Sequence, residues 1–148
     1  MISSTVPTVR AQLVTRLAAR AGLAGVQVSQ YHPGDQVQPE AIFTGKVTGR
    51  HDISSIKAGR KNRDETYDLD VVVSVLGSTD GKLETAETRA FALLAEIEGE
   101  LADDPRIGLA PTVVNWCKAG DFEESATRTD QGPLFEIKMA MEVVARLT

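Results

Sequence analysis

The residues best suited to metal chemistry are two histidines that lie far apart in polar stretches. His32 is followed by Pro33, and His51 is followed by Asp52. They lack the i, i+4 spacing with which a helix presents two imidazoles to one metal ion. His51 and Asp52 could still share a metal with further carboxylates, which leaves a small α+β metal-dependent hydrolase as an alternative function. We expect instead that the pair is solvated, with no metal site and no cofactor.

A second group of reactive residues surrounds the single cysteine. Cys117 follows Trp116 in a short apolar stretch. A catalytic thiol needs a neighbouring base and an electropositive setting, and the sequence indicates neither. We therefore expect Cys117 to be a buried structural residue and Trp116 to lie in the core or in a subunit interface. Asp121, Glu123 and Glu124 could act as acid and base, but we expect them at a solvated hairpin tip.

Composition and motifs exclude several classes of protein. The chain has 148 residues, within the ~100–200 of one domain, so a single domain over residues 1–148 is expected. Sixteen basic and 21 acidic residues give a net charge of −5, which disfavours a dedicated nucleic-acid or membrane-surface protein. One cysteine excludes an internal disulfide. The sequence shows neither a membrane-length apolar run nor the order of a secretory signal. It also has no phosphate-binding loop and no nucleophile elbow, so we predict no enzyme and no catalytic residue.

Apolar residues at spacings of three and four predict two amphipathic helices. The first runs from about Val6 to Ala21, with Thr5 as its expected N-cap and Gly22 as its stop. The second runs from about Lys82 to Leu101 and ends before Pro105. The apolar stripes are Val6, Val9, Leu13 and Leu17 in the first helix and Ala86, Ala90, Leu94, Ile97 and Leu101 in the second. The arginines expected off the first stripe are Arg10, Arg16 and Arg20.

Period-two alternation predicts two long strands, Glu65 to Leu76 and Phe135 to Ala145. Their apolar faces carry Tyr67, Leu69, Val71, Val73 and Val75 in the first strand, and Phe135, Ile137, Met139, Met141 and Val143 in the second. Shorter strands are expected at Val26–Gln30, Ile42–Val47 and Val113–Lys118. One buried and one wet face favour antiparallel pairing. We therefore predict an α+β fold in the order α-β-β-β-α-β-β, with a single mostly antiparallel sheet and two helices packed on one face.

Two polar segments are expected as long loops, Tyr31–Pro39 and Thr48–Asp64. The second contains a basic run formed by Lys57, Arg60, Lys61 and Arg63. The run could be a solvated loop, a segment that docks on an acidic partner surface, or a DNA contact. The DNA reading ranks last, because the run has no interleaved aromatic residues and the net charge of the chain is negative.

Asp68 and Asp70 are predicted on the wet face of the first long strand. Carboxylates two residues apart on one face repel each other modestly. They could simply face solvent. Alternatively they could form part of an acidic wall on an assembled object, which would let a polyanion slide past without binding.

Taken as a whole, the chain resembles the tail terminator (tail-completion) proteins of long-tailed bacteriophages. The resemblance follows the order of its segments over nearly the whole length. These are TVPTVRAQLVTRLAARAGL, a Pro/Gly turn, EAIFTGKV, RDETYDLDVVVSVLG, AETRAFALLAEIEGEL and the closing FEIKMAMEVVARL. A related interpretation, another neck or head–tail joining protein, stays an alternative. The Trp116-Cys117 pair and the length of the Lys57 segment have no counterpart in this resemblance.

The resemblance implies a structural virion protein that forms a ring, typically a hexamer, on the last ring of a tail tube. Such a ring stops tube polymerisation and presents a surface to the head connector, while DNA passes through the lumen without specific binding. Expected partners are therefore further copies of the chain, the tail tube protein and the connector or head-completion protein, with no membrane. In this reading Lys57, Arg60, Lys61 and Arg63 form a partner-docking loop, and Asp68 and Asp70 face the lumen. The expected location is the tail or neck of the virion, after assembly in the host cytoplasm.

Overall fold

A computed structural model describes residues 4–56 and 61–147, with side chains placed over 4–52 and 63–147. Its helices are α1 (Val6–Ala19) and α2 (Leu83–Asp103), and its strands are β1 (Gln27–Ser29), β2 (Glu40–Ile56), β3 (Lys61–Leu76), β4 (Trp116–Thr129) and β5 (Gly132–Leu147). The strands form one sheet in the order β1-β2-β3-β5-β4. The short β1 is parallel to β2, and the other pairs are antiparallel. The predicted α+β class and element order are confirmed.

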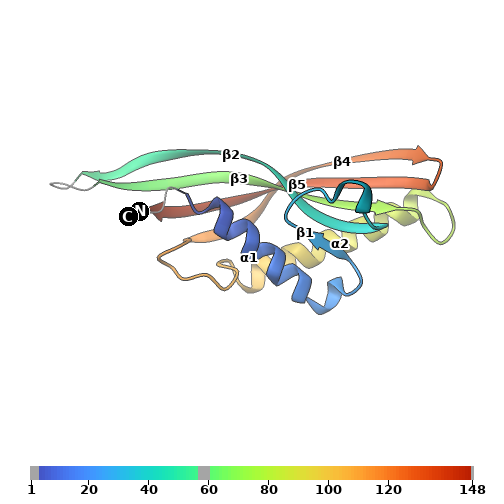
Figure 1. The fold of residues 1–148 in the computed structure, drawn as a ribbon, viewed down its shortest axis with the longest axis horizontal. Coiled ribbons are helices and arrows are strands. Elements are labelled where there is room, and N and C mark those ends of the chain that lie inside the picture. Colours follow the sequence, from blue (N-terminus) through green and yellow to red (C-terminus); the bar gives the residue numbers. More distant parts are fainter. Residues whose placement is uncertain (1–3, 57–60, 148) are drawn as a thin grey trace.

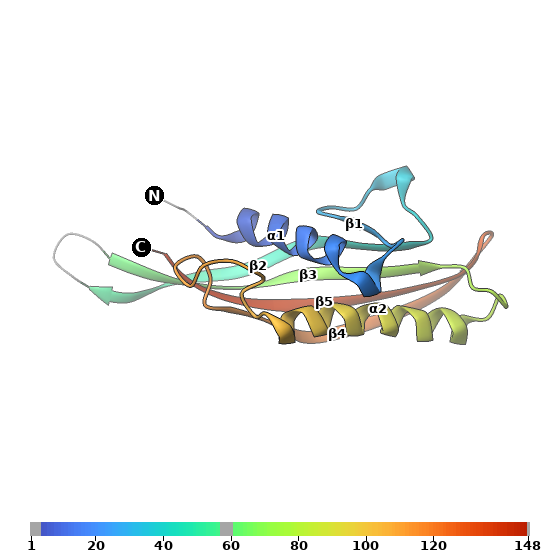
Figure 2. The same ribbon diagram turned by 90° about the horizontal axis from the view of Figure 1, so that it is seen from below.

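Both helices cover the same face of the sheet (Figures 1 and 2). The alternating apolar residues of β3 and β5 point toward them, so that Leu69, Val71 and Ile137 are fully buried. The apolar faces of the two helices pack into the same core, where Leu13 and Ile97 are also fully buried. The hydrophobic effect therefore selects one face of each strand, as the period-two pattern predicts. Within the described residues neither helix is long and apolar enough to cross a membrane.

The helix ends differ from the expectation in two details. The α-helical part of α1 ends at Ala19, and a 3-10 turn over Ala21–Leu23 follows it. Thr5 occupies the N-cap position of α1, but its hydroxyl accepts no capping hydrogen bond from the helix and instead donates one to Glu65 of the sheet. Helix α2 reaches Asp103, close to the predicted end.

Arginines of α1 join the two helices. Arg16 Nε lies 2.6 Å from Glu100, and Arg20 Nε lies 2.7 Å from Glu96, both on α2. These two arginines lie off the apolar stripe, as predicted. The same prediction is wrong for Arg10, whose residue surface is only 6% exposed.

The predicted polar loop Thr48–Asp64 is wrong. Strand β2 continues to Ile56 and β3 already begins at Lys61, so most of the segment is a long β-hairpin that extends beyond the helices (Figure 1). Residues from His51 to Ile53 pair in register with residues from Glu65 to Arg63. In the described part of the chain neither α1 nor α2 reaches the end of this hairpin, so core packing imposes no apolar alternation on Thr48 to Asp52. Backbone pairing holds them, and backbone pairing has no sequence signature.

The predicted position of the following hairpin is also wrong. Strand β4 runs from Trp116 to Thr129, and the turn falls at Asp130 and Gln131. Asp121, Glu123 and Glu124 therefore lie within an edge strand rather than at a hairpin tip. From Gly120 to Thr129 every residue of β4 is exposed, which explains the missing alternation.

Candidate functional site: the open sheet face and its two free edges

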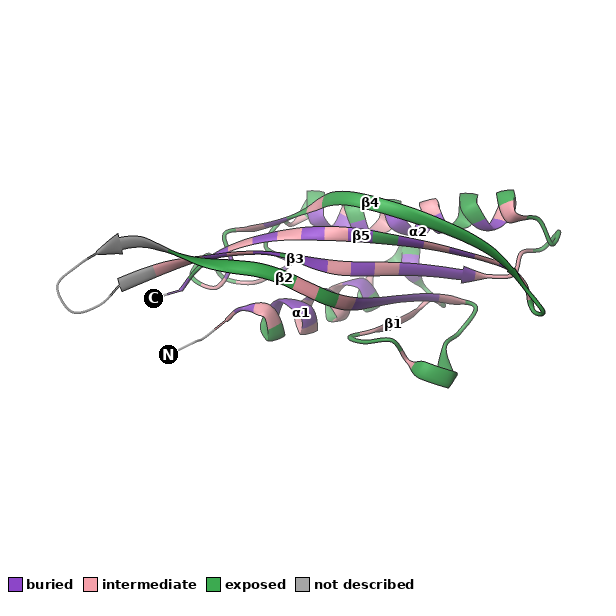
Figure 3. Cartoon of the chain, turned by 90° about the horizontal axis from the view of Figure 1, so that it is seen from above, coloured by how far each residue is buried: buried purple, intermediate pink, exposed green. Residues whose placement is uncertain are grey.

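The sheet face that points away from the helices carries the polar residues of the alternating strands; we call it the open face. In Figure 3 it faces the viewer, with α1 and α2 behind it. Asp68 is exposed on this face and Asp70 is half-buried. Their placement on the wet side follows from Tyr67, Leu69 and Val71, which alternate with them and are buried in the core. Whether the two aspartates line a lumen is a separate prediction.

Most charges of the open face lie in cross-strand pairs. Lys138 of β5 contacts Glu123 of β4 at 2.8 Å, and Arg146 contacts Asp64 at 3.0 Å. Hydrogen bonding to Lys138 lowers the pKa of Glu123. Asp68, in contrast, stands directly opposite Glu142, another carboxylate. Like charges placed opposite each other in an antiparallel pair are unfavourable. Glu142 also has the ammonium of Lys118 of β4 at 3.8 Å on its other side, so this row carries two carboxylates and one ammonium.

The sheet has two long edges without a strand partner in the described part of the chain. On one side β1 covers β2 only from Ala41 to Phe43, which leaves the residues from Thr44 onward free. On the other side β4 has β5 as its only neighbour and is exposed almost throughout (Figure 3). Such edges present unpaired N–H and C=O groups, which proteins either protect or pair with another chain. Sequence reasoning anticipated open edges but not their length.

The predicted docking residues are only partly placed. Lys57 and Arg60 lie outside the described residues. Lys61 begins β3, with its side chain outside the described part, and Arg63 pairs in register with Leu147. Of the basic run, Lys61 and Arg63 therefore lie at the far end of β3, away from the helices (Figure 1). Its docking role stays a prediction.

The geometry separates the candidate hydrolase residues. Strand alternation places His51 on the helical side and Asp52 on the open face, where Asp52 pairs with Arg50 at 2.9 Å. Among the described residues no group of three His, Cys, Asp or Glu side chains could hold a metal ion. Trp116 is half-buried at the start of edge strand β4, with the ammonium of Lys118 5.1 Å from its ring.

A buried carboxylate near the start of the chain is the main polar feature that sequence reasoning missed. Glu65 is 3% exposed and accepts hydrogen bonds from Ser4 Oγ at 2.6 Å and from both the amide and the hydroxyl of Thr5, at 2.8 and 2.6 Å. His51 Nε2 lies 2.8 Å from Glu65 Oε2. Gly49 leaves the space in which Tyr67 packs, and the Tyr67 hydroxyl completes the network 3.1 Å from Thr5.

The network joins the beginning of α1 to the base of the β2–β3 hairpin. Burial opposes ionisation of Glu65, but the four hydrogen bonds from Ser4, Thr5 and His51 outweigh it, so the pKa of Glu65 lies below its ordinary value. The carboxylate also stands at the N-terminal end of α1, where negative charge is favourable. The position of Glu65 in its strand could have identified it. Alternate residues of a strand point to the same face, so Glu65 points to the helical side together with Tyr67 and Leu69.

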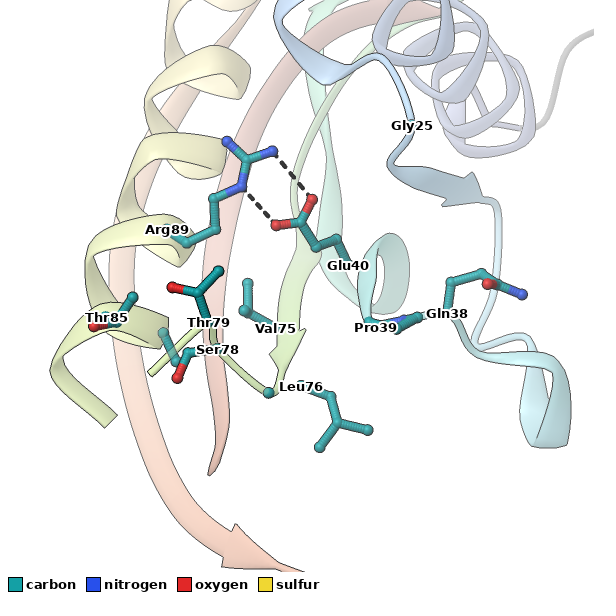
Figure 4. Close-up of a pocket in the computed structure, with 12 residues that line it drawn as sticks. Gly25, Gln38, Pro39, Glu40, Val75, Leu76, Ser78, Thr79, Thr85 and Arg89 are labelled. Carbon is teal, nitrogen blue, oxygen red and sulfur yellow. Dashed lines mark hydrogen bonds and ion pairs between the residues drawn. The ribbon is translucent and has the colours of Figure 1, made fainter. Parts of the chain in front are cut away.

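A cavity of about 660 Å³ lies between α2 and the start of β2 (Figure 4). Pro39, Val75 and Ala86 supply apolar wall, and Arg89 closes one side through two hydrogen bonds to Glu40, at 2.6 and 3.1 Å. Neither histidine nor cysteine occurs among its described lining residues. The remaining wall carries the hydroxyls of Ser78, Thr79 and Thr85.

Cys117 is 1% exposed, as predicted for a structural residue. Burial, followed by the charge of Asp104, raises the pKa of the thiol to about 12. We therefore expect the native protein to resist a thiol reagent such as a maleimide at pH 8, and to react fully after unfolding in guanidinium. Labelling followed by intact mass measurement checks this, and rapid modification of the native protein would contradict it.

Comparisons with known proteins add a shared fold. No family model matches the chain, and no curated protein matches it. The chain is similar to a solved structure from the virion of a native gene transfer agent particle, with a TM-score of 0.66 and 15% sequence identity. The match covers 99% of this chain and 100% of that chain. The likeness therefore extends over the whole fold rather than one motif.

Proposed function

We propose that this protein is a structural component of a phage-type virion, and that it forms a ring that caps the tail tube. The ring, expected as a hexamer, stops tube polymerisation and joins the tail to the head connector. The main support is the pair of long, free and oppositely directed strand edges, which fit a closed assembly of identical copies. The whole-length similarity to a chain of a gene transfer agent virion agrees with a structural, non-enzymatic role.

The strand directions make the two edges compatible. Strands β2, β3, β5 and β4 alternate in direction, so β4 runs opposite to β2. Rotation about an axis roughly parallel to the strands preserves strand direction from one copy to the next. The free edge of β4 in one copy then meets the free edge of β2 in the next as an antiparallel pair. Such head-to-tail contacts close into a ring where the rotation allows it.

The open face would line the lumen of this ring. Asp68, Glu142 and Asp70, with Lys118 paired to Glu142, would then face the passing DNA with a net negative charge. Repulsion keeps the polyanion from binding as it moves through. The basic run of Lys57, Arg60, Lys61 and Arg63 would dock on an acidic surface of the tube or of the connector. Mismatch between the outer ring surface and a tube subunit would stop further addition.

The proposal is tested by polymerising the tail tube protein of the same genome in the presence and absence of this protein. Capped tubes of limited length, with a ring visible at one end by negative-stain electron microscopy, are the expected result. A variant in which Lys57, Arg60, Lys61 and Arg63 are all alanine should bind tubes at least tenfold more weakly while keeping its melting temperature. Tubes of unchanged length without terminal rings would contradict the proposal. Rings that bind only the head connector would favour another neck protein instead.

A further inference from the structure

Arg10 of α1 is a cation that is buried in its own chain without a counter-ion. Only 6% of the residue surface is exposed. Among the described residues its one hydrogen-bond acceptor is the hydroxyl of Thr44, 3.2 Å from Nη1. The ring of Tyr31 covers one side of the guanidinium, with its centroid 4.3 Å from Cζ. A guanidinium has five N–H donors, so most of them have no acceptor among these residues.

Two neighbouring arginines show what Arg10 lacks. Arg16 of α1 lies 2.6 Å from Glu100, and Arg20 at the C-cap of α1 lies 2.7 Å from Glu96. In the described part of the chain no carboxylate lies within ion-pair distance of Arg10. A buried charge is unfavourable unless it has an opposite charge or a full set of hydrogen bonds. We therefore expect an anion to stabilise the isolated chain by binding at Arg10.

The surroundings of the guanidinium favour a carboxylate as that anion. Tyr31 covers one face of the group, and one N–H of Nη1 is bound to Thr44. Thr44 is itself fixed, because its hydroxyl donates to the backbone carbonyl of Gln30. An anion therefore has to approach in the plane of the guanidinium. A carboxylate is also planar, and its two oxygens match two parallel N–H groups of an arginine.

The site stands beside the free edge of β2, on the helical side of the sheet. Thr44 is the first residue of β2 beyond the part that β1 covers. A segment of another protein that pairs with β2 from Gly45 onward stays clear of β1, and its end lies beside Arg10. Tyr31, which is 62% exposed, offers an aromatic contact at the same place. In the proposed ring DNA passes the open face, so its phosphates do not reach this side.

We propose that Arg10, Thr44 and Tyr31 form a binding site for one carboxylate, which an aspartate or glutamate of a neighbouring protein subunit supplies in the virion. The carboxylate binds in the plane of the guanidinium, and the exposed ring of Tyr31 packs against the neighbour. The source of the carboxylate rests on the proposed function, whereas the site itself belongs to the isolated chain. The unpaired charge therefore destabilises the free subunit and stabilises the assembled one.

The first experiment tests the site on the isolated chain, with sodium acetate as the probe. The wild type should melt about 2 °C or more higher in about 0.2 M acetate than in sodium chloride of the same ionic strength and pH. Arg10→Met should show no such difference. Equal melting temperatures of the wild type in the two salts would overturn the site. A larger rise with inorganic phosphate than with acetate would overturn the assignment to a carboxylate.

The second experiment compares Arg10→Met with Arg16→Met, a control on the same helix, in chloride. Arg10→Met should melt at or above the temperature of the wild type, because methionine fills the buried space without an unpaired charge. Arg16→Met should melt about 3 °C or more below it, because Glu100, which is 7% exposed, loses a cation. A greater loss for Arg10→Met than for Arg16→Met would mean that Arg10 is already satisfied within its own chain, against the proposal.

The third experiment measures the protein concentration at half-maximal ring formation, by native mass spectrometry in solution or by microscopy of tube ends. Arg10→Met should raise it at least tenfold, and so should Arg10→Lys, since an ammonium keeps the charge but loses the planar pair of donors. Arg16→Met should change it less than threefold. Unchanged assembly of Arg10→Met would rule out a neighbouring subunit as the source. Absence of rings for the wild type would overturn the proposed function and that source, while the acetate comparison still decides whether the site exists.

Discussion

Replacing Glu65 with glutamine is expected to lower the free energy of unfolding by about 2–3 kcal/mol, since the change leaves a buried polar network without its charge. The wild-type carboxylate accepts bonds from Ser4, Thr5 and His51 while it is 3% exposed. An amide offers one acceptor oxygen and brings two donors that this site does not need. For a chain of this size the loss corresponds to a melting temperature lower by about 5–10 °C. Urea unfolding at pH 7, under conditions where the chain is monomeric, measures it.

The matched control is Asp68→Asn, three residues further along the same strand. Asp68 is exposed on the open face and stands opposite Glu142, so removing its charge should change stability by less than about 0.5 kcal/mol. Equal losses for the two variants would show that the Glu65 network has no special role. A stable Glu65→Gln variant would mean that the start of α1 is held by apolar packing alone.

The same network predicts a dependence on pH. The folded-state pKa of Glu65 lies below its unfolded value of about 4.3. Ionised Glu65 therefore contributes its full stabilisation above that value, and the contribution is lost as the pH falls through the folded-state pKa. We expect the difference between wild type and Glu65→Gln to be constant from pH 7 to about 5 and to shrink below about pH 4. A difference that grows toward acid would contradict this assignment.

Proline in the middle of edge strand β4 is expected to abolish ring formation without unfolding the domain. In an edge strand, N–H groups alternate between the neighbouring strand and solvent. Of two consecutive positions, such as Ser125 and Ala126, one donates toward β5 and the other toward the free edge. Proline is tolerated only at the outward position, where it removes a donor that a second copy would need.

The prediction is therefore a pair of results from Ser125→Pro and Ala126→Pro. One variant should melt within about 3 °C of the wild type, because the fold loses no hydrogen bond between β4 and β5. The same variant should form no ring, either on tubes or in solution. The other should be destabilised by about 3 kcal/mol or more. Native mass spectrometry and thermal melting separate the two. Rings formed by the stable variant would mean that β4 is not the contact edge.

The sequence predicted best the elements whose burial is one-sided. The alternation through Tyr67, Leu69 and Val71 placed β3 correctly, because core packing imposes period two on every residue that it reaches. The same rule failed for β4, where no residue beyond Ala119 is buried, and for β2 from Thr48 to Asp52, where every residue is exposed. These strands are held by backbone pairing with the next strand of their own hairpin, which imposes no apolar alternation on the exposed residues.

Polar residues were predicted correctly where their strand neighbours are apolar and missed where a charged residue points to the helical side. Asp68 was placed correctly on the wet face because its neighbours in the strand are apolar and buried. Arg10 and Glu65 were missed because their character opposes their position: each is charged, yet each points to the helical side. The alternation of faces along β3 could by itself have identified Glu65. Burial of Arg10 depends on Tyr31 and Thr44, which approach it from distant parts of the chain, so no local pattern indicates it.

The pairing of β3 with β5 also has a consequence for folding kinetics. Arg63 pairs with Leu147 and Leu76 with Leu134, so the central strand acquires its second neighbour only when the final strand has been synthesised. Contacts of such long sequence separation are slow to form. Nascent chains thus pass through a stage in which β3 lies open on one side, vulnerable to aggregation. Yield in the cell should accordingly depend on chaperone supply more than on the stability of the finished domain.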